Sequence, residues 1–395
     1  MSYIEQIKSK ISELRCVDIL TEDMVWQEHG TLIWRAEKFD GFPFFYNIYR
    51  YQDYYSFSLL ALILLKNNLK PNKLALDIIN APVFDNLPGN MTVDNEIEKL
   101  GGPFTKQFDL NNIDEYCTLL AKAMIKDIDI IEEKHPGKTN IIMCGGRDSM
   151  NLLLLPWKNP VVAFSAQPNF PLVASFIKNN KLNIELFELK DNFDEKTLKD
   201  ELVEACCRTD LAHWRWGADL IQTSKKYERN AILWKGQLGD VFMTDSWKHF
   251  ITPYVEPQRT VRRIYKKISY LLPQFINHKI GKKYQPVVIN RVWEVCSSLQ
   301  GGHVSFLRAL MDMLVLSAYN GPNVSKVLER ADLGALCQND IRPKVGKILF
   351  GKNVFYPAEN PHPEMSNFRE NLHSPKLFYD ALRAEGVEII EQSRV

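Results

Sequence analysis

Residues 144–149, Cys-Gly-Gly-Arg-Asp-Ser, combine the residue types that hold a phosphate group. Two glycines let backbone N–H groups approach an anion closely, and the helix expected next adds its positive dipole end. The carboxylate of Asp148 would repel a bare phosphate, so it indicates a Mg²⁺ ion between the two. Ser149 can donate its hydroxyl to a phosphate oxygen. The alternative is an ordinary strand-to-helix turn in which an Asp-Ser pair caps the helix.

A second glycine loop, residues 235–240 (Lys-Gly-Gln-Leu-Gly-Asp), follows another apolar run. Asp240 could share one Mg²⁺ with Asp148, because a single carboxylate supplies few of the oxygen ligands that this ion needs. The loop residues expected beside the ligand are Gly236, Gln237 and Gly239. The alternative for Asp240 is a helix cap or a turn residue.

A third stretch, residues 340–347 (Asp-Ile-Arg-Pro-Lys-Val-Gly-Lys), carries basic groups around a proline and a glycine. We expect a turn here, and a mobile, basic turn would suit a flap that closes over phosphates. Lys344 is the first candidate for the active cation and Lys347 the second. By composition alone, an ordinary surface turn is the simpler interpretation.

These loops need a scaffold that brings them together, and the pattern between them predicts one. Apolar β-rich runs alternate with helical patterns over about 100 residues, which predicts right-handed crossovers and a parallel sheet. Ligands bind such sheets at the carboxyl ends of the strands. The expected strands are 141–143, 161–164, 184–189 and 231–234. The expected helices are 112–133, 150–155, 171–179, 194–207 and 211–227.

We expect a smaller α+β domain before this unit, at residues 1–110, and the main domain at 111–395. Residues 1–30 indicate a helix and a loop, and residues 57–67 a buried helix. Two aromatic-rich strands, 31–35 and 44–49, are expected to form a hairpin through Asp40 and Gly41. Their aromatic side chains suggest a packed face rather than a base-stacking platform, because few basic residues lie among them. The Pro- and Gly-rich stretch 82–108 marks the boundary.

The last part of the chain is predicted to be mainly helical, at 259–272, 285–299, 304–319 and 324–331. Residues 259–283 contain eight lysines and arginines and no acidic residue. These basic groups fall opposite the apolar face of the predicted helix. They indicate a solvated face or, as the alternative, a contact with an acidic partner.

Composition limits the class of protein. The chain has 395 residues, 45% apolar and 25% charged, with a net charge of +1, as expected for a soluble globular protein and not for a nucleic-acid or membrane-surface binder. No apolar run approaches the roughly 18 residues of a membrane span, and the N-terminus does not resemble a signal peptide. Seven cysteines without a C-x-x-C pair indicate the reducing cytoplasm, without structural zinc or disulfides.

Taken in order and spacing, the three stretches resemble the synthetase domain of the asparagine synthetase-like ATP pyrophosphatases. That family includes asparagine synthetase, β-lactam synthetase and the lasso-peptide cyclases. Residues 144–149 are similar to its S-G-G-x-D-S loop, with Cys144 at the first position. The resemblance covers roughly residues 110–357. It implies an adenine-nucleotide α-hydrolase-like (PP-loop) core, with ATP and Mg²⁺ as cofactors.

The resemblance also implies roles for individual residues. Asp148 and Asp240 would hold Mg²⁺ on ATP, and Lys344 would be the essential lysine that stabilises charge during adenylation and acyl transfer. Pyrophosphate would lie on the first loop, whose relevant residues are Gly145, Gly146 and Ser149. Adenosine would contact the end of the strand that begins at residue 161, with Phe164 and Ser165 nearby.

Besides Cys144 in place of the serine, the chain departs from the family in two places. The family's second loop is G-E-G-x-D-E, whereas residues 236–241 are Gly-Gln-Leu-Gly-Asp-Val, so both glutamates and one glycine are replaced. The family's glutaminase domain needs a cysteine exposed after Met removal, and this chain has Ser2 there. Ammonia from glutamine is therefore not the expected nucleophile.

The favoured hypothesis is a ligase that adenylates a small-molecule or peptide carboxylate, releases pyrophosphate, and couples the carboxyl group to an amine. A second hypothesis is an RNA-modifying PP-loop enzyme, with the 259–283 segment binding RNA; the near-zero net charge argues against it. A third is a nucleotide-binding protein that has lost its activity, which the missing glutamates would explain. The sequence does not indicate an oligomeric state.

Overall fold

A computed structural model provides the structure of the chain. It describes residues 3–28, 31–41, 48–72, 92–100, 107, 109–190, 220, 223–244, 311–336, 340–358 and 375–390. The predicted helices at 194–207, 259–272 and 285–299 lie outside these ranges, together with the basic segment 259–283 and most of the predicted 211–227 helix. Most of the loop-rich stretch 82–108 also lies outside them.

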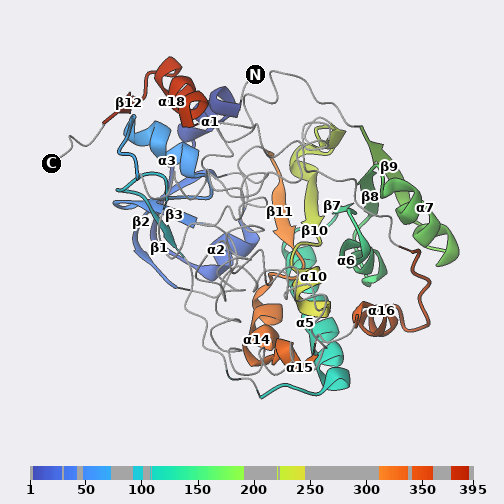
Figure 1. Cartoon of the computed structure of the whole chain (residues 1–395). Coiled ribbons are helices and arrows are strands. Elements are labelled where there is room, and N and C mark those ends of the chain that lie inside the picture. Colours follow the sequence, from blue (N-terminus) through green and yellow to red (C-terminus); the bar gives the residue numbers. More distant parts are fainter. Residues whose placement is uncertain are drawn as a thin grey trace, which may run out of the picture.

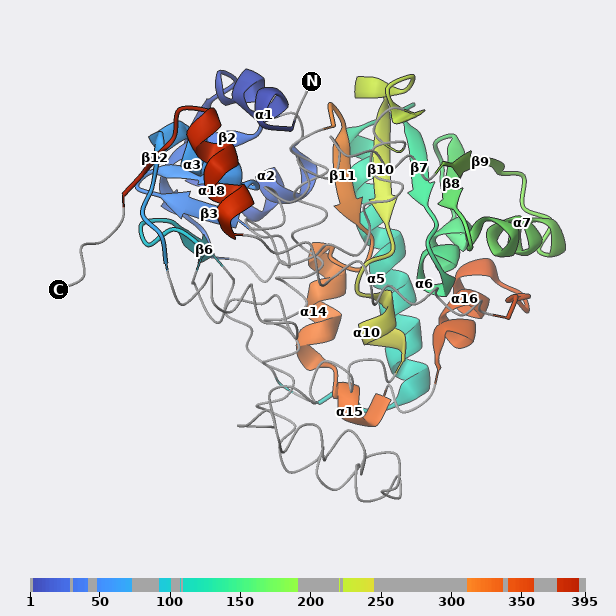
Figure 2. The ribbon, with the colours of Figure 1, turned by 45° about the horizontal axis from the view of Figure 1, so that its top comes forward.

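The main sheet is five-stranded and parallel, in the order β11-β10-β7-β8-β9. Its strands are β7 (Thr139–Met143), β8 (Val161–Ala166), β9 (Glu185–Leu189), β10 (Ala231–Lys235) and β11 (Leu314–Ser317). The chain starts at β7, builds outward through β8 and β9, and then returns to place β10 and β11 on the opposite side of β7 (Figure 2). The predicted parallel sheet is confirmed, and the direction of winding reverses between β7 and β10.

One strand of this sheet corrects a prediction. Residues 304–319 were expected to form a helix, yet Leu314–Ser317 is a strand, and every one of its residues is buried. It pairs in parallel with β10 from Ile232↔Leu314 to Lys235↔Ser317. A short apolar run fits a buried helix and a buried strand equally well, so periodicity alone could not distinguish them.

Helices cover and support the sheet. Those along the main unit are α5 (Ile113–Lys134), α6 (Arg147–Met150), the 3-10 helix η1 (Asn151–Leu154), α7 (Phe170–Asn179), α10 (Gly239–Met243), α14 (Pro322–Arg330), α15 (Leu333–Leu336) and α16 (Arg342–Phe350). Asn112 caps α5 through its side-chain oxygen, as expected for a helix predicted at 112–133. Buried Asp127 of α5 accepts hydrogen bonds from the backbone N–H groups of Asn323 and Val324, and so fixes α14 against α5.

The N-terminal elements form a second five-stranded sheet, in the order β1-β2-β4-β3-β6. The elements of this region are α1 (Tyr3–Ile11), β1 (Arg15–Leu20), α2 (Glu22–Gln27), β2 (Ile33–Phe39), β3 (Ile48–Tyr51), β4 (Tyr54–Ser56), α3 (Leu59–Lys66), β5 (Asn68–Leu69) and β6 (Glu98–Leu100), of which β5 lies outside this sheet. The predicted buried helix at 57–67 is confirmed as α3.

Two expectations for this region are wrong. Residues 1–30 contain the strand β1, in which Leu20 is buried and the other residues are exposed or partly exposed, so the strand shows no clear alternation of apolar and polar residues. The predicted hairpin is not seen among the described residues, because β2 pairs with β4 and not with β3; residues 44–47 of its expected second strand lie outside the described part of the chain. The hairpin that does form joins β3 to β4 through Gln52 and Asp53, where Gln52 has a left-handed φ of 54°. A tight turn without glycine gave no sequence signal.

The C-terminal end of the described chain returns to this N-terminal lobe. β12 (Glu388–Ile389) pairs in parallel with β5, and α18 (Pro375–Ala384) lies beside α1 and α3 (Figure 1). Phe378 and Leu382 of α18 are fully buried. Residues 375–390 therefore pack with the first lobe, although they follow the main sheet in sequence.

The helix α2 joins the lobe to the main sheet. The Trp26 ring lies edge-on to Trp234 of β10, with the ring centroids 6.2 Å apart. At the end of α5, His135 Nε2 lies 3.2 Å from the backbone oxygen of Gln27. None of the helices in the described ranges is both long and apolar enough to cross a membrane.

Candidate functional site

The two glycine loops predicted from the sequence meet at the carboxyl ends of β7 and β10. A Cβ atom on Gly236 would lie 2.7 Å from Cα of Ser149, and one on Gly239 would lie 2.5 Å from Cβ of Asp148. Neither position has room for a side chain, so glycine lets the second loop touch the first. The structure thus brings together residues about 90 positions apart at the point where the strand order reverses.

In the first loop, two backbone amides converge on one oxygen atom. The N–H groups of Gly145 and Gly146 donate to Oγ of Ser149, at 3.0 and 3.2 Å, and that hydroxyl donates to the oxygen of Gly146 at 2.9 Å. A Cβ atom added to either glycine would meet no described atom within 4 Å. A phosphate oxygen can replace the hydroxyl in this arrangement, so the loop has donors and space for a phosphate.

Three of the predicted site residues are buried beneath the loop. Cys144 and Phe164 have no exposed surface, and burial raises the pKa of the Cys144 thiol. Ser165, also fully buried, donates its hydroxyl to the backbone oxygen of Cys144 at 2.7 Å. The Phe164 ring packs against Phe187, with the centroids 5.3 Å apart. These side chains support the loop from the core, and with no exposed surface they do not reach a ligand bound on the loop.

Asp148 lies at the mouth of the site with its backbone fixed. The hydroxyl of buried Tyr319 donates to the backbone oxygen of Asp148 at 2.8 Å, and burial raises the pKa of Tyr319. The Asp148 side chain is 20% exposed. Oxygen donors suit Mg²⁺, which in nucleotide sites takes one or two carboxylates together with phosphate oxygens. Asp148 fits that requirement; the backbone of Asp240 belongs to α10, and its side chain is outside the described part of the structure.

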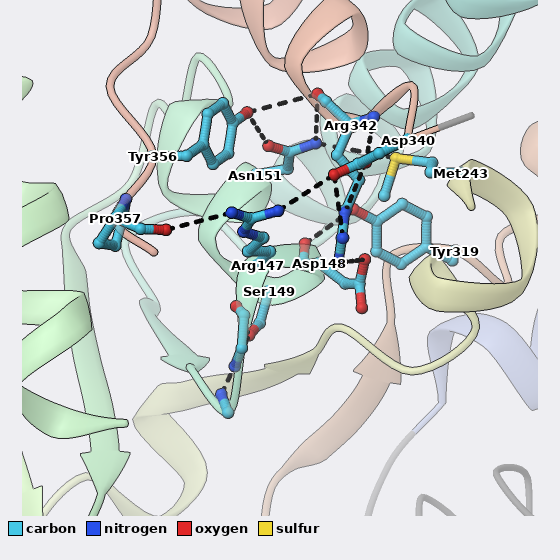
Figure 3. A network of polar contacts seen from close by, with 12 residues as sticks. Arg147, Asp148, Ser149, Asn151, Met243, Tyr319, Asp340, Arg342, Tyr356 and Pro357 are labelled. Atoms are coloured by element: carbon cyan, nitrogen blue, oxygen red, sulfur yellow. Dashed lines mark hydrogen bonds and ion pairs between the residues drawn. The ribbon is translucent and has the colours of Figure 1, made fainter. Parts of the chain in front are cut away.

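A chain of alternating charges runs from this carboxylate, and the sequence did not reveal it (Figure 3). Arg342 Nη1 lies 3.3 Å from Oδ1 of Asp148, while its Nε and Nη2 contact Asp340 at 2.8 and 3.0 Å. Arg147 Nη1 contacts the same Asp340 carboxylate at 3.2 Å. All four residues lie within the predicted stretches, but composition does not indicate which acid pairs with which base. Within the described ranges, no group of three His, Cys, Asp or Glu side chains could hold a metal alone.

The third stretch is a helix, which corrects the expected turn. α16 begins at Arg342, and Pro343 lies in its first turn, where a missing N–H costs nothing. Lys344 points to the start of α5, with Nζ 2.8 Å from Oδ1 of Asp114, and this hydrogen bond raises the pKa of Lys344. Lys347 is exposed on the same helix. The structure places neither lysine in a described contact with the two loops.

A polar clamp holds the start of α16 against the first loop. Asn151 Nδ2 donates to the backbone oxygen of Arg342 at 3.3 Å, and the Tyr356 hydroxyl donates to Asn151 Oδ1 and, at 3.4 Å, to the same Arg342 oxygen (Figure 3). Burial raises the pKa of Tyr356. Gly346 completes the clamp, since a Cβ there would lie 1.9 Å from the Tyr356 hydroxyl.

Comparison with known proteins adds no family to these observations: no protein-family model matches the chain, and no curated protein matches it at a significant level.

Proposed function

We propose that the chain binds Mg·ATP between the loops 144–149 and 236–239 and uses it to adenylate a carboxylate, which it then couples to an amine. The observation that supports this proposal most is the meeting of two glycine loops at the reversal point of a doubly wound parallel sheet. Such a point is where mononucleotides bind in open α/β sheets. In this proposal the main sheet is a PP-loop core.

Each loop residue has a task that its surroundings support. The amides of Gly145 and Gly146 already converge on an oxygen, so they bind a phosphate oxygen once the Ser149 hydroxyl turns to donate to the same group. Asp148, held by Tyr319, provides a carboxylate for Mg²⁺, with Asp240 from α10 as the second candidate. When bound, Mg²⁺ neutralises charge on the phosphates and acts as a Lewis acid.

The reaction follows from the weakness of a carboxylate as an acyl donor. A carboxylate oxygen of the substrate attacks the α-phosphorus of ATP, and the bond from that phosphorus to pyrophosphate breaks. The amides of the first loop offset the charge that accumulates on the leaving pyrophosphate. An amine then attacks the acyl carbon, AMP leaves, and the amine nitrogen loses a proton. The substrates we expect are a small-molecule or peptide carboxylate and an amine acceptor.

Product analysis tests this proposal. The chain, incubated with Mg·ATP and mixtures of amino acids and short peptides, should form AMP and pyrophosphate in equal amounts, and chelation of Mg²⁺ should stop it. The variant Asp148→Asn, which removes the proposed Mg²⁺ ligand, should lose most of this turnover. ADP and phosphate as products would exclude this chemistry. Mg·ATP binding without any turnover would favour the nucleotide-binding protein, and AMP formation that requires added tRNA would favour the RNA-modifying enzyme.

A further inference from the structure

Arg342 reaches the candidate site from a segment distant in sequence. It is the first residue of α16, and its backbone oxygen accepts a hydrogen bond from Asn151, which belongs to η1 directly after the first loop. Its side chain is 11% exposed. A guanidinium buried to this degree next to a proposed phosphate site is a candidate ligand contact.

The guanidinium is held so that one nitrogen faces Asp148. Nε and Nη2 bind the two oxygens of Asp340, and Nη1 lies 3.3 Å from Asp148 (Figure 3). The backbone N–H of Arg342 also donates to Asp340, at 3.1 Å, so the carboxylate is fixed to the helix start. The planar fork therefore keeps its direction even when the contact with Asp148 is lost.

Mg²⁺ and Nη1 of Arg342 compete for the same carboxylate. A divalent cation on Asp148 would repel the guanidinium and weaken its contact with this carboxylate. A nucleotide bound to the metal would offset this repulsion, because it would bring a negatively charged phosphate oxygen to which Nη1 can donate. Nη1 can therefore donate to the Asp148 carboxylate before Mg·nucleotide binds and to a phosphate oxygen afterwards.

We propose that Arg342 is a phosphate-binding residue of this site that neutralises Asp148 until Mg²⁺ arrives and then donates Nη1 to a phosphate of the Mg·nucleotide. Asp340 is its positioning residue. This inference rests on the proposed function, because it requires Mg·ATP at the two loops. It identifies the phosphate contact with Arg342 and not with the lysines of the same helix.

We expect Arg342→Gln to change the affinity for Mg²⁺ alone and the affinity for Mg·phosphate ligands in opposite directions. Arg342→Gln removes the competing cation, so Mg²⁺ alone should bind several-fold more tightly. It also removes a charge-assisted hydrogen bond to phosphate, so Mg·pyrophosphate and Mg·ATP should bind about tenfold or more weakly. General damage to the site would weaken the binding of all three ligands. Arg342→Lys keeps the charge without the fork, so Mg²⁺ alone should bind as to the parent while Mg·pyrophosphate still binds weakly.

Calorimetric titration of the full chain with MgCl₂, Mg·pyrophosphate and Mg·ATP measures these affinities. Lys352→Gln, which removes an exposed lysine just after α16, is the charge-matched control and should equal the parent. Asp340→Asn should weaken Mg·pyrophosphate binding. The double variant Asp340→Asn with Arg342→Gln should bind Mg·pyrophosphate no more weakly than Arg342→Gln alone. A parent that binds no Mg·ATP would refute the proposed function. A parent that binds it, with Arg342→Gln binding Mg·pyrophosphate equally well, would refute only the role of Arg342.

Discussion

Arg342 and Lys344 are two residues apart, yet their cationic groups meet different acids. Successive residues of an α-helix are about 100° apart, so positions i and i+2 point in nearly opposite directions. Arg342 therefore faces Asp148 and Asp340, while Lys344 binds Asp114 at the start of α5. If Lys344 acts on the substrate, its ammonium group must first leave Asp114, which is an exposed and weakly held partner.

We predict that Lys344→Ala lowers kcat by on the order of 100-fold with a smaller effect on KM, because a charge delivered late acts mainly on the transition state. Lys344→Arg should not restore the rate. Steady-state kinetics of AMP formation measure both values. If Lys347→Ala abolishes adenylation while Lys344→Ala keeps kcat within about threefold, the catalytic role belongs to Lys347, one helical turn further on.

Among the elements, the parallel sheet was predictable and the helix α16 was not. Apolar runs such as 141–143 and 231–234 are buried on both faces, and they alternate with helices, so the sequence pattern carries the topology. α16 contains Pro343 and Gly346 and is followed by Gly351, and residues of these types usually mark turns. Gly351 does end the helix in a left-handed conformation. Gly346 lies inside the helix, at a position where the Tyr356 hydroxyl leaves no room for a Cβ atom.

The clamp around Gly346 gives a prediction for α16. Gly346→Ala would bring a Cβ to 1.9 Å from the Tyr356 hydroxyl and 3.1 Å from Oδ1 of Asn151, which also hold the Arg342 backbone. We expect it to lower the free energy of unfolding by about 1–3 kcal/mol, as overpacking does, and to weaken Mg·ATP binding. Denaturant unfolding and calorimetry measure the two effects.

The control for this prediction is the double variant Gly346→Ala with Tyr356→Phe. It removes the hydroxyl that the new methyl group would meet, so it should recover part of the stability lost in the single variant. Equal stability of Gly346→Ala and the parent would show that Tyr356 moves aside without loss of stability, which would mean that Tyr356 does not fix α16.

At the scale of the whole molecule, contacts between segments distant in sequence are the features that the sequence pattern did not predict. The pairing of β12 with β5, and of Arg342 with Asp148, each joins residues more than 190 positions apart. The periodicity of the sequence does not indicate such pairs, because they depend on how the elements pack in the folded chain. The meeting of the two glycine loops was predictable because both follow strands of one parallel sheet, whose carboxyl ends share an edge.

Because residues 375–390 pack against the N-terminal lobe, we predict that they stabilise it. Leu382 of α18 is fully buried, and Leu382→Ala should lower the free energy of unfolding by about 2–5 kcal/mol. Glu385→Gln, which breaks the exposed ion pair with Lys8, should cost less than about 1 kcal/mol. Urea unfolding measures both variants. Similar small losses in both would mean that α18 contributes little to the lobe.

The central claim is that Mg·ATP binds between the loops after β7 and β10, with Asp148 on the metal. Calorimetric titration of the full chain with ATP, with and without Mg²⁺, tests it most directly. We predict Mg²⁺-dependent binding that Asp148→Asn weakens about tenfold or more, while Asp129→Asn, at a surface carboxylate paired with Lys158, leaves it unchanged. Mg·ATP binding of equal strength in Asp148→Asn and the parent, or no binding by the parent, would contradict the account.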